Sequence, residues 1–298
     1  MSASENSHGD DRFWRWASFA PALAIMALFT VLPLINLGAM SFFKISWQEA
    51  KSIWDPVGAK NYTDLATDKL FHASLRNTGI FAVTSVLIQV LIGFALALFC
   101  SKITRGRTLY WMVFILPLLI PGIVIGAIWK LILNADFGLI NQFLALFSIW
   151  PVDWLGDESI ALFSVVMVDV WHWTPFCFLL LLAGIESLPQ DIYEQAKIDG
   201  ASGWQELINI TLPLMAPAIL VTFVFRFIVA FKVFDEVYLL TAGGPGTATE
   251  VLSFTIYQRF FTENRAGFGA AMSIAVIFLI CLMLVVASTA RRRAGSSA

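Results

Sequence analysis

The chain has 298 residues, of which 58% are hydrophobic and only 13% are charged. Soluble domains contain about 45–50% apolar and about 25% charged residues, so this composition excludes an ordinary water-soluble enzyme. A formal net charge of −2 also provides no basic footprint for nucleic acid.

Six apolar runs are long enough to cross a bilayer, which takes about 20 residues as an α-helix. In chain order they are Trp16–Met40, Thr78–Cys100, Leu109–Leu133, Ile160–Ala183, Leu214–Leu240 and Phe268–Ala290. The first run is too long for a cleavable signal, and no small-residue cleavage site follows it. The pattern therefore predicts an all-α integral membrane protein with six transmembrane helices.

The Lys and Arg residues orient these spans, because cytoplasmic loops carry an excess of both. They gather before the first span, between the second and third spans, and after the sixth: Arg12, Arg15, Lys102, Arg105, Arg107, Arg291, Arg292 and Arg293. The connection Asn134–Ser159 contains acidic residues but no Lys or Arg. The segment Phe43–Ala73 dissents with four Lys, which four acidic residues balance. We therefore expect both termini in the cytoplasm.

The connection between the fourth and fifth spans is polar and is patterned as helix, turn, helix. A Leu-Pro pair interrupts the fourth helix, and Asp191 is expected to cap a short helix that ends at Asp199. Gly200 suits the left-handed residue that terminates such a helix. Ser202 and Gln205 have the spacing of a capping box, which opens a second helix. We therefore expect a rigid projection on the cytoplasmic side.

Two roles fit this projection. An amphipathic helix could rest on the membrane surface, or the loop could dock into a groove of a soluble partner. Only one cation, Lys197, stands among five carboxylates in this segment. Anionic headgroups repel such a segment, so the charge pattern favours docking.

Three groups of residues in this loop stand at a recognisable spacing: Glu194-Gln195-Ala196, Asp199-Gly200-Ala201 and Ile210-Thr211-Leu212-Pro213. They resemble the EAA loop of ABC importer permeases, with a departure at Gln195, where that family usually has Ala. The resemblance implies a type I ABC importer permease fold, with residues 186–213 as a coupling loop seated in a cleft of an ATPase subunit. The residues implied in this coupling are Tyr193, Glu194, Ala196, Asp199, Gly200 and Ala201.

Two further stretches resemble carbohydrate-importer permeases, the branch that contains the maltose and glycerol-phosphate permeases. Phe231–Phe261 is similar to the end of their fifth span and the following outer loop, and is typical of the first of two non-identical permeases. Val57–Thr78 is similar to the entry to their core. The resemblance implies a bacterial inner-membrane subunit for uptake of a sugar or sugar derivative. Its expected divisions are the N-terminus, first span and first periplasmic loop in 1–73, the permease core in 74–290, and a basic cytoplasmic tail in 291–298.

The resemblance also implies three kinds of protein partner: a second homologous permease, an ABC ATPase dimer and a periplasmic solute-binding protein. The sequence contains no GxxxxGK[ST] phosphate loop, so we expect no cofactor on this chain, with ATP and Mg²⁺ bound by the ATPase. The run Gly243–Gly246 forces a turn at the outer face, either as a plain reversal or as a contact with the binding protein.

Two other classes of protein compete with this reading. A secondary transporter should show internal repeats or interrupted helices that hold ion ligands, and no clear internal repetition is present. A membrane enzyme needs a nucleophile with its base or a metal cluster, whereas only three His and three isolated Cys are available. An importer of a non-carbohydrate solute remains the nearer alternative.

Ionisable residues within apolar spans are functional-site hypotheses by default. The candidates for a substrate path are Asp169, Trp171, His172, Arg226, Asp235 and Tyr238. His172 and its neighbouring Trp residues fit either a pore that stacks on sugar rings or an interfacial aromatic belt. Lys232 is expected to pair with Asp235 and Glu236 within its own helix.

Arg226 has no acidic residue within four positions on either side, so it needs a partner from outside its helix. A salt bridge to Asp169 on the fourth span is the first expectation. The alternatives are contact with an anionic group of the substrate, which the planar guanidinium suits, or bonds to water or backbone carbonyls.

Overall fold

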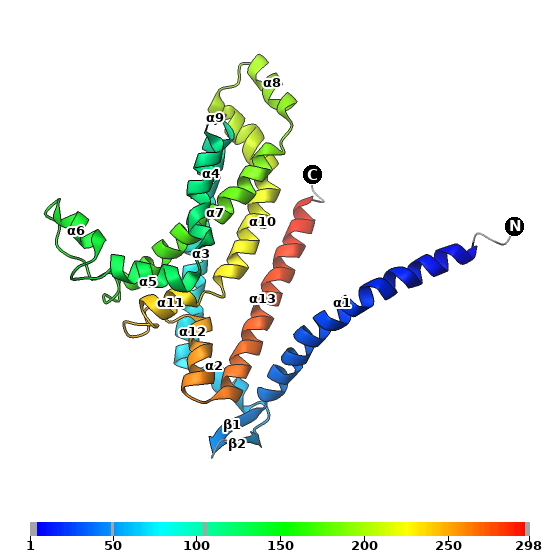
Figure 1. Cartoon of the computed structure of the whole chain (residues 1–298), viewed down its shortest axis with the longest axis vertical. Coiled ribbons are helices and arrows are strands. Elements are labelled where there is room, and N and C mark those ends of the chain that lie inside the picture. Colours follow the sequence, from blue (N-terminus) through cyan, green and yellow to red (C-terminus); the bar gives the residue numbers. More distant parts are fainter. Residues whose placement is uncertain (1–4, 49–50, 104–105, 296–298) are drawn as a thin grey trace. The chain divides into compact units, whose positions relative to one another are not determined.

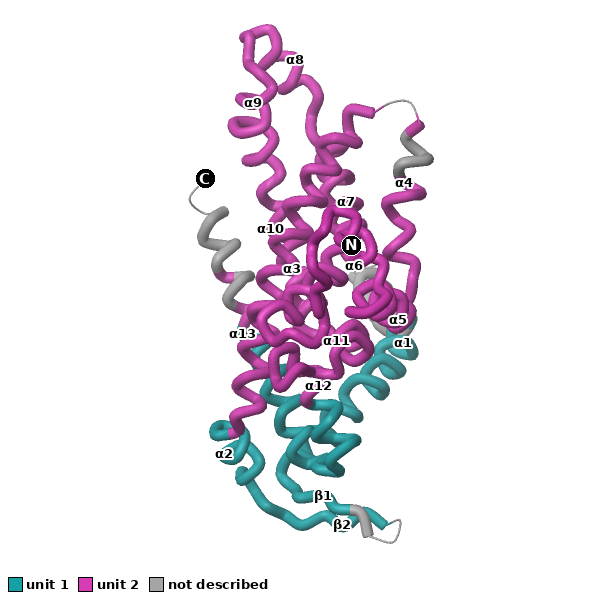
Figure 2. Tube along the Cα trace, turned by 90° about the vertical axis from the view of Figure 1, so that its left-hand side faces the viewer, with its two compact units in different colours: residues 1–67, 256–282 teal, residues 68–255, 283–298 magenta. Residues whose placement is uncertain are grey.

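The computed structural model describes residues 5–48, 51–103 and 106–295 (Figure 1). The chain divides into two compact units, which are coloured separately in Figure 2. Unit 1 consists of residues 1–67 and 256–282, and unit 2 consists of residues 68–255 and 283–298.

Unit 1 contains the first long helix, a hairpin, a short helix and most of the last helix. Its elements are α1 (Glu5–Met40), β1 (Phe43–Gln48), β2 (Lys51–Pro56), α2 (Lys60–Thr67), η3 (Gln258–Thr262) and α13 (Ala266–Gly295). The hairpin is antiparallel and pairs Phe43 with Pro56 and Gln48 with Lys51. The expected fold was all-helical, and the charged sequence of this segment did not indicate a hairpin.

Unit 2 is helical in its described part. Its elements are α3 (Lys69–Ser101), α4 (Arg107–Ile115), η1 (Leu116–Leu119), α5 (Gly122–Ile132), α6 (Leu139–Ala145), α7 (Ala161–Glu186), α8 (Gln190–Ile198), α9 (Gly203–Glu206), η2 (Leu207–Thr211), α10 (Leu212–Ala230), α11 (Asp235–Leu240) and α12 (Leu252–Tyr257). The packing of α3 against α7 forms the core, where Phe81, Val86, Val165 and Phe178 are fully buried. Helix α10 packs on both of these helices.

Five helices of the described chain are long and apolar enough to cross a membrane: Ser18–Met40, Lys69–Ser101, Ala161–Glu186, Gly203–Ala230 and Ala266–Val285. A sixth crossing requires the pair Trp111–Leu119 and Gly122–Ile132, which bends by 99°. The prediction of one unbroken helix at Leu109–Leu133 is therefore wrong. Pro121 precedes α5 and Ile120 is extended, because proline disfavours a helical conformation at the residue before it.

The fifth span also differs from the expected Leu214–Leu240. Helix α10 ends at Ala230, a turn follows, and α11 begins at Asp235. Val233 lies in this turn, and its carbonyl accepts a hydrogen bond from the hydroxyl of Ser253 on α12. Lys232 consequently lies outside any helix, and the expected intrahelical pairing with Asp235 and Glu236 is wrong.

Most of the basic residues that predict the orientation of the spans lie, wholly or in their side chains, beyond what the structure describes. The side chains of Arg12, Arg15, Arg107 and Arg291–Arg293, and all of Arg105, lie outside the described residues.

Candidate functional site

The polar loop after the fourth span projects from unit 2 as a helix followed by a sharp turn. In Figures 1 and 2, α8 lies at one extremity of this unit, beyond α9. Helix α7 ends at Glu186, and α8 starts after Pro189, which occupies the capping position. The expectation that Asp191 caps this helix is wrong, because Asp191 lies inside the first turn. Its carboxylate there still complements the positive end of the helix dipole.

Gly200 ends α8 in the left-handed conformation, with φ of +74°. The Gly200 amide donates to the carbonyl of Lys197 at 3.1 Å, and the Ala201 amide donates to that of Ala196 at 2.9 Å. These two bonds form a Schellman motif, in which glycine avoids the steric cost that a Cβ atom carries at positive φ. The turn is therefore fixed by its own backbone bonds.

The second half of the loop is fixed equally well. The Ser202 amide donates to Gln205 Oε1 at 2.7 Å, and the Ser202 hydroxyl accepts from the Gln205 amide at 3.4 Å. The expected capping box is thus present. However, α9 does not stand as a separate helix, since it continues through the π-helical turn η2 into α10. The second half of the loop is therefore continuous with the fifth span.

Tyr193 braces the two halves against each other. Its hydroxyl lies 3.0 Å from the Thr211 hydroxyl, so a side chain of α8 is tied to the start of the fifth span. Other side chains of the loop face outward: Glu194 is exposed, Ile198 is 85% exposed and Trp204 is 70% exposed. Large apolar side chains exposed on a rigid projection are typical of a surface that a partner covers.

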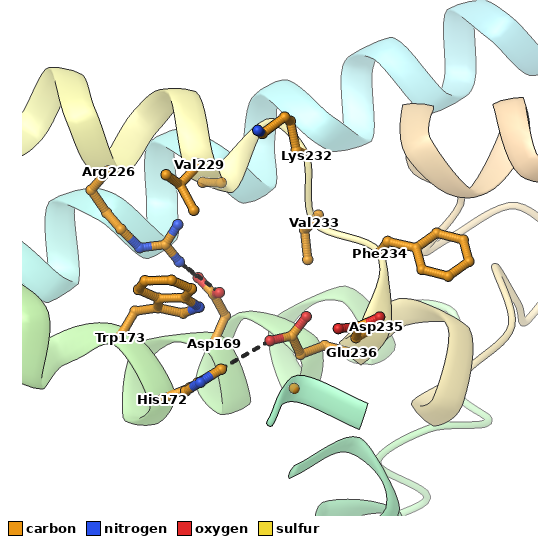
Figure 3. A pocket seen from close by; sticks show the side chains of 12 residues that line it. Asp169, His172, Trp173, Arg226, Val229, Lys232, Val233, Phe234, Asp235 and Glu236 are labelled. Carbon is orange, nitrogen blue, oxygen red and sulfur yellow. Dashed lines mark hydrogen bonds and ion pairs between the residues drawn. The ribbon is translucent and has the colours of Figure 1, made fainter. Parts of the chain in front are cut away.

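A second candidate site is a cavity of about 210 Å³ between α5, α7, α10 and the turn that follows α10 (Figure 3). Its lining combines five charged residues with His172 and aromatic side chains: Gly122, Asp169, His172, Trp173, Arg226, Val229, Ala230, Lys232, Val233, Phe234, Asp235 and Glu236. Ionisable groups within spanning helices are functional-site hypotheses by default, so we take this cavity as a candidate site.

Arg226 and Asp169 form the buried ion pair that was the first expectation. Nη2 of Arg226 lies 2.6 Å from Oδ1 and 2.7 Å from Oδ2 of Asp169, and both residues are 1% exposed. Gln89 on α3 donates to the same carboxylate at 2.8 Å. The Arg226 guanidinium also lies 4.6 Å from the centroid of the Trp173 ring. The pair therefore joins α7 to α10, and Trp173 limits the movement of the arginine.

The arginine is only partly used by this pair. Both of its bonds to Asp169 come from Nη2, whereas Nε is buried and has no hydrogen-bond partner in the described structure. Oε1 of Gln89 is also buried without a partner. Buried polar atoms are normally satisfied. Nε of Arg226, which lines the cavity, is therefore available to water or to a ligand there, whereas Gln89 does not line the cavity.

A second pair joins α7 to the other side of the break in the fifth span. Nδ1 of His172 lies 3.1 Å from Oε1 of Glu236 on α11, and both side chains are 7% exposed. The two pairs therefore connect one helix to segments before and after the turn at residues 231–234. The sequence analysis missed Glu236 as a partner of His172, because no spacing rule relates residues on different helices.

The structure brings together four of the six residues expected along a substrate path: Asp169, His172, Arg226 and Asp235. Trp171 is outside this cavity and packs on Trp129, with ring centroids 5.5 Å apart. Tyr238 is also outside and stacks on Phe234 at 5.4 Å. The cavity is also lined by residues that were not among the candidates, including Trp173, Lys232, Phe234 and Glu236.

The chain is similar to known transport proteins over most of its length. A family model described as "Binding-protein-dependent transport system inner membrane component" matches residues 70–294. The trehalose/maltose transport system permease protein MalF of Thermococcus litoralis is 35% identical over 267 residues, covering 89% of each chain. The sulfoquinovosyl glycerol transport system permease protein SmoG of Agrobacterium fabrum is 29% identical and covers 92% of this chain and 89% of its own.

Among solved structures, a bacterial ABC transporter involved in the import of the acidic polysaccharide alginate contains a chain with the same fold. It superposes with a TM-score of 0.83 at 25% identity, covering 97% of this chain and 99% of that chain. Spanning helices, a projecting loop and a charged cavity among the spans define a membrane transport subunit. The chain belongs to the family of inner-membrane components of binding-protein-dependent transport systems, as a multi-pass ABC importer permease.

Proposed function

We propose that this chain is one of two non-identical permease subunits of an ABC importer for a sugar or sugar derivative. The names of the relatives support this solute class. Two of them are named for the transport of trehalose/maltose and of sulfoquinovosyl glycerol, and the structural neighbour is involved in the import of alginate. An importer of a non-carbohydrate solute is the alternative. In the proposed assembly both termini and the loop at 186–213 face the cytoplasm, and the binding protein docks on the opposite side.

The observation that carries the coupling part of this proposal is the rigidity of the projecting loop. The Schellman motif at Gly200, the capping box at Ser202 and the brace from Tyr193 hold the loop in one shape. A rigid loop that continues into the fifth span transmits a push, whereas a flexible loop dissipates it. We assign the residues Tyr193, Glu194, Ala196, Asp199, Gly200 and Ala201 to this docking surface and its support.

The mechanism that follows is alternating access. ATP and Mg²⁺ bind to the ATPase subunits, whose closure moves the docked loops and opens the permeases toward the binding protein. Hydrolysis returns the permeases to the inward-facing state. The solute path runs past the cavity at Asp169, His172, Arg226 and Asp235, where carboxylates and Nε of Arg226 satisfy hydroxyl groups.

Omission of the second permease tests the expected subunit composition. One chain offers one projecting loop, while an ATPase dimer presents two grooves, so two permease chains are needed, and we expect the second to be a non-identical homologue. Vesicles that contain this chain, the ATPase and the binding protein but no second permease should show little ATP-dependent uptake. Uptake equal to that of the complete set would mean that the chain pairs with itself. Calorimetry on the accompanying binding protein then identifies the solute.

A further inference from the structure

Two membrane spans of unit 1 meet at their ends. Helix α1 ends at Met40, and α13 begins at Ala266. A Cβ atom on Gly267 would lie 3.1 Å from the Met40 carbonyl oxygen and would overlap that of Phe43. The start of one span is therefore packed against the end of the other. Because apolar spans stop at the edge of the hydrocarbon, the residues just beyond them lie at the level of the lipid headgroups.

Aromatic side chains support this placement. Phe42 and Tyr62 pack with ring centroids 5.6 Å apart, and Phe43 and Trp54 pack at the same distance. Trp54 remains 42% exposed. Tyr and Trp are enriched where a membrane meets water, since their rings are apolar and their polar atoms are hydrated. The hairpin and α2 thus lie at the membrane interface.

A cavity of about 280 Å³ opens at this level, entirely within unit 1. Its lining comes from β1, α2, the start of α13 and the connections before these two helices: Lys44, Ile45, Ser46, Val57, Lys60, Asn61, Asp64, Asn264, Arg265, Gly267 and Phe268. Ile45 and Phe268 are each 4% exposed and give the cavity an apolar base. Three cationic side chains outnumber the single carboxylate of Asp64. Two further carboxylates lie next to the cavity without lining it: Asp55 stands opposite Lys44 in the hairpin, and Glu263 lies 3.9 Å from Arg265.

Arg265 is held in an orientation that leaves its donors accessible. Its guanidinium lies 4.4 Å from the centroid of the Phe268 ring, and its side chain is 46% exposed. The contact of Arg265 with Glu263 is long, at 3.9 Å. An arginine fixed on an aromatic face loses less freedom on binding than a free one, and its planar group suits phosphate oxygens.

We propose that this cavity binds the phosphate of an anionic phospholipid, with phosphatidylglycerol as the chemical type. The three cations Lys44, Lys60 and Arg265 contact the phosphodiester, the apolar base accepts the glycerol carbons, and the acyl chains run along α1 and α13. A carboxylate of a soluble partner, such as the binding protein, would match the cations but would leave the apolar base formed by Ile45 and Phe268 unused. The proposal does not depend on which solute the importer carries.

Native mass spectrometry of the full purified chain tests the proposal, with phosphatidylglycerol and phosphatidylcholine of identical acyl chains as the probes. The wild type should retain phosphatidylglycerol in preference to phosphatidylcholine. The variant Lys44→Gln/Lys60→Gln/Arg265→Gln should bind phosphatidylglycerol on the order of 100-fold more weakly, at ~5-fold per cation. Binding of phosphatidylcholine should not change. Circular dichroism and size exclusion establish that the variant is folded, and if it is not, Arg265→Gln alone should show the ~5-fold loss.

The matched control removes three exposed cations outside the cavity, as Lys51→Gln/Lys69→Gln/Arg76→Gln. It should retain phosphatidylglycerol like the wild type. An equal loss in both variants would mean a general charge effect and would overturn the site. Displacement of phosphatidylglycerol by inorganic phosphate at equal concentration would identify a free-anion site. Unchanged lipid binding by the triple cavity variant, together with loss of its ATPase stimulation by the binding protein, would identify a protein contact. Each of the last two outcomes contradicts the lipid site.

Discussion

Replacing Arg226 by glutamine is expected to destabilise the folded chain by about 3–5 kcal/mol, because the change leaves the Asp169 carboxylate buried without its cationic partner. Both side chains are 1% exposed, and Asp169 then retains only the weaker bond from Gln89. The measurement is the thermal inactivation of the purified assembly, together with its ATP-dependent uptake. The exposed Arg76 provides the control, since Arg76→Gln should change neither quantity.

The double variant Arg226→Gln/Asp169→Asn separates the structural role of the pair from a role in transport. Two neutral amides remove the buried charge, so folding should return close to that of the wild type. Recovered stability and recovered uptake mean that the pair only joins α7 to α10. Recovered stability without uptake means that Arg226 also contacts the solute. Wild-type stability and uptake in Arg226→Gln would contradict both roles.

Replacing Gly200 by valine is expected to abolish solute-stimulated ATP hydrolysis while the spans still insert. A residue with a Cβ atom at positive φ costs about 1–2 kcal/mol, and a β-branched side chain costs more. The turn after α8 would change shape to relieve this strain, and the exposed side chains of Ile198 and Glu194 would no longer fit one groove. Normal transport by Gly200→Val in reconstituted vesicles would contradict the docking role.

Gly203 offers a matched control for this substitution. It lies three residues further along the same loop, and a Cβ atom at either glycine would meet no heavy atom within 4 Å. Of these two glycines, only Gly200 has a positive φ. Gly203→Val should therefore retain most of the stimulated hydrolysis. Equal losses in both variants would point to the bulk of the side chain and not to the backbone conformation.

Local patterns in the sequence predicted the features that depend on neighbouring residues. Gly200 and the pair Ser202 and Gln205 follow from turn and capping chemistry, which acts over a few positions. The ion pair of Arg226 and Asp169 followed from a cost argument, because an arginine in a span without an acid in its own helix requires a distant partner.

The features that the sequence did not reveal depend on contacts between distant segments. No Pro or Gly marks the end of α10 at Ala230, and a bond from Ser253 supports the turn that follows. Glu236 therefore reaches His172 instead of Lys232. The bend near Pro121 did have a local signal, which is the proline itself. It was not predicted because the residues on both sides form one continuous apolar run. The roles assigned to the loop and the cavity stay predictions.

Isolation of the tagged chain from membranes tests the central claim most directly. The chain should be recovered with a second, homologous permease and two ATPase subunits, and the ATPase should dissociate when Gly200 is replaced by valine but not when Gly203 is. Recovery of a transport-competent chain with no ATPase bound would contradict the account, because it would leave the projecting loop without the partner that drives transport.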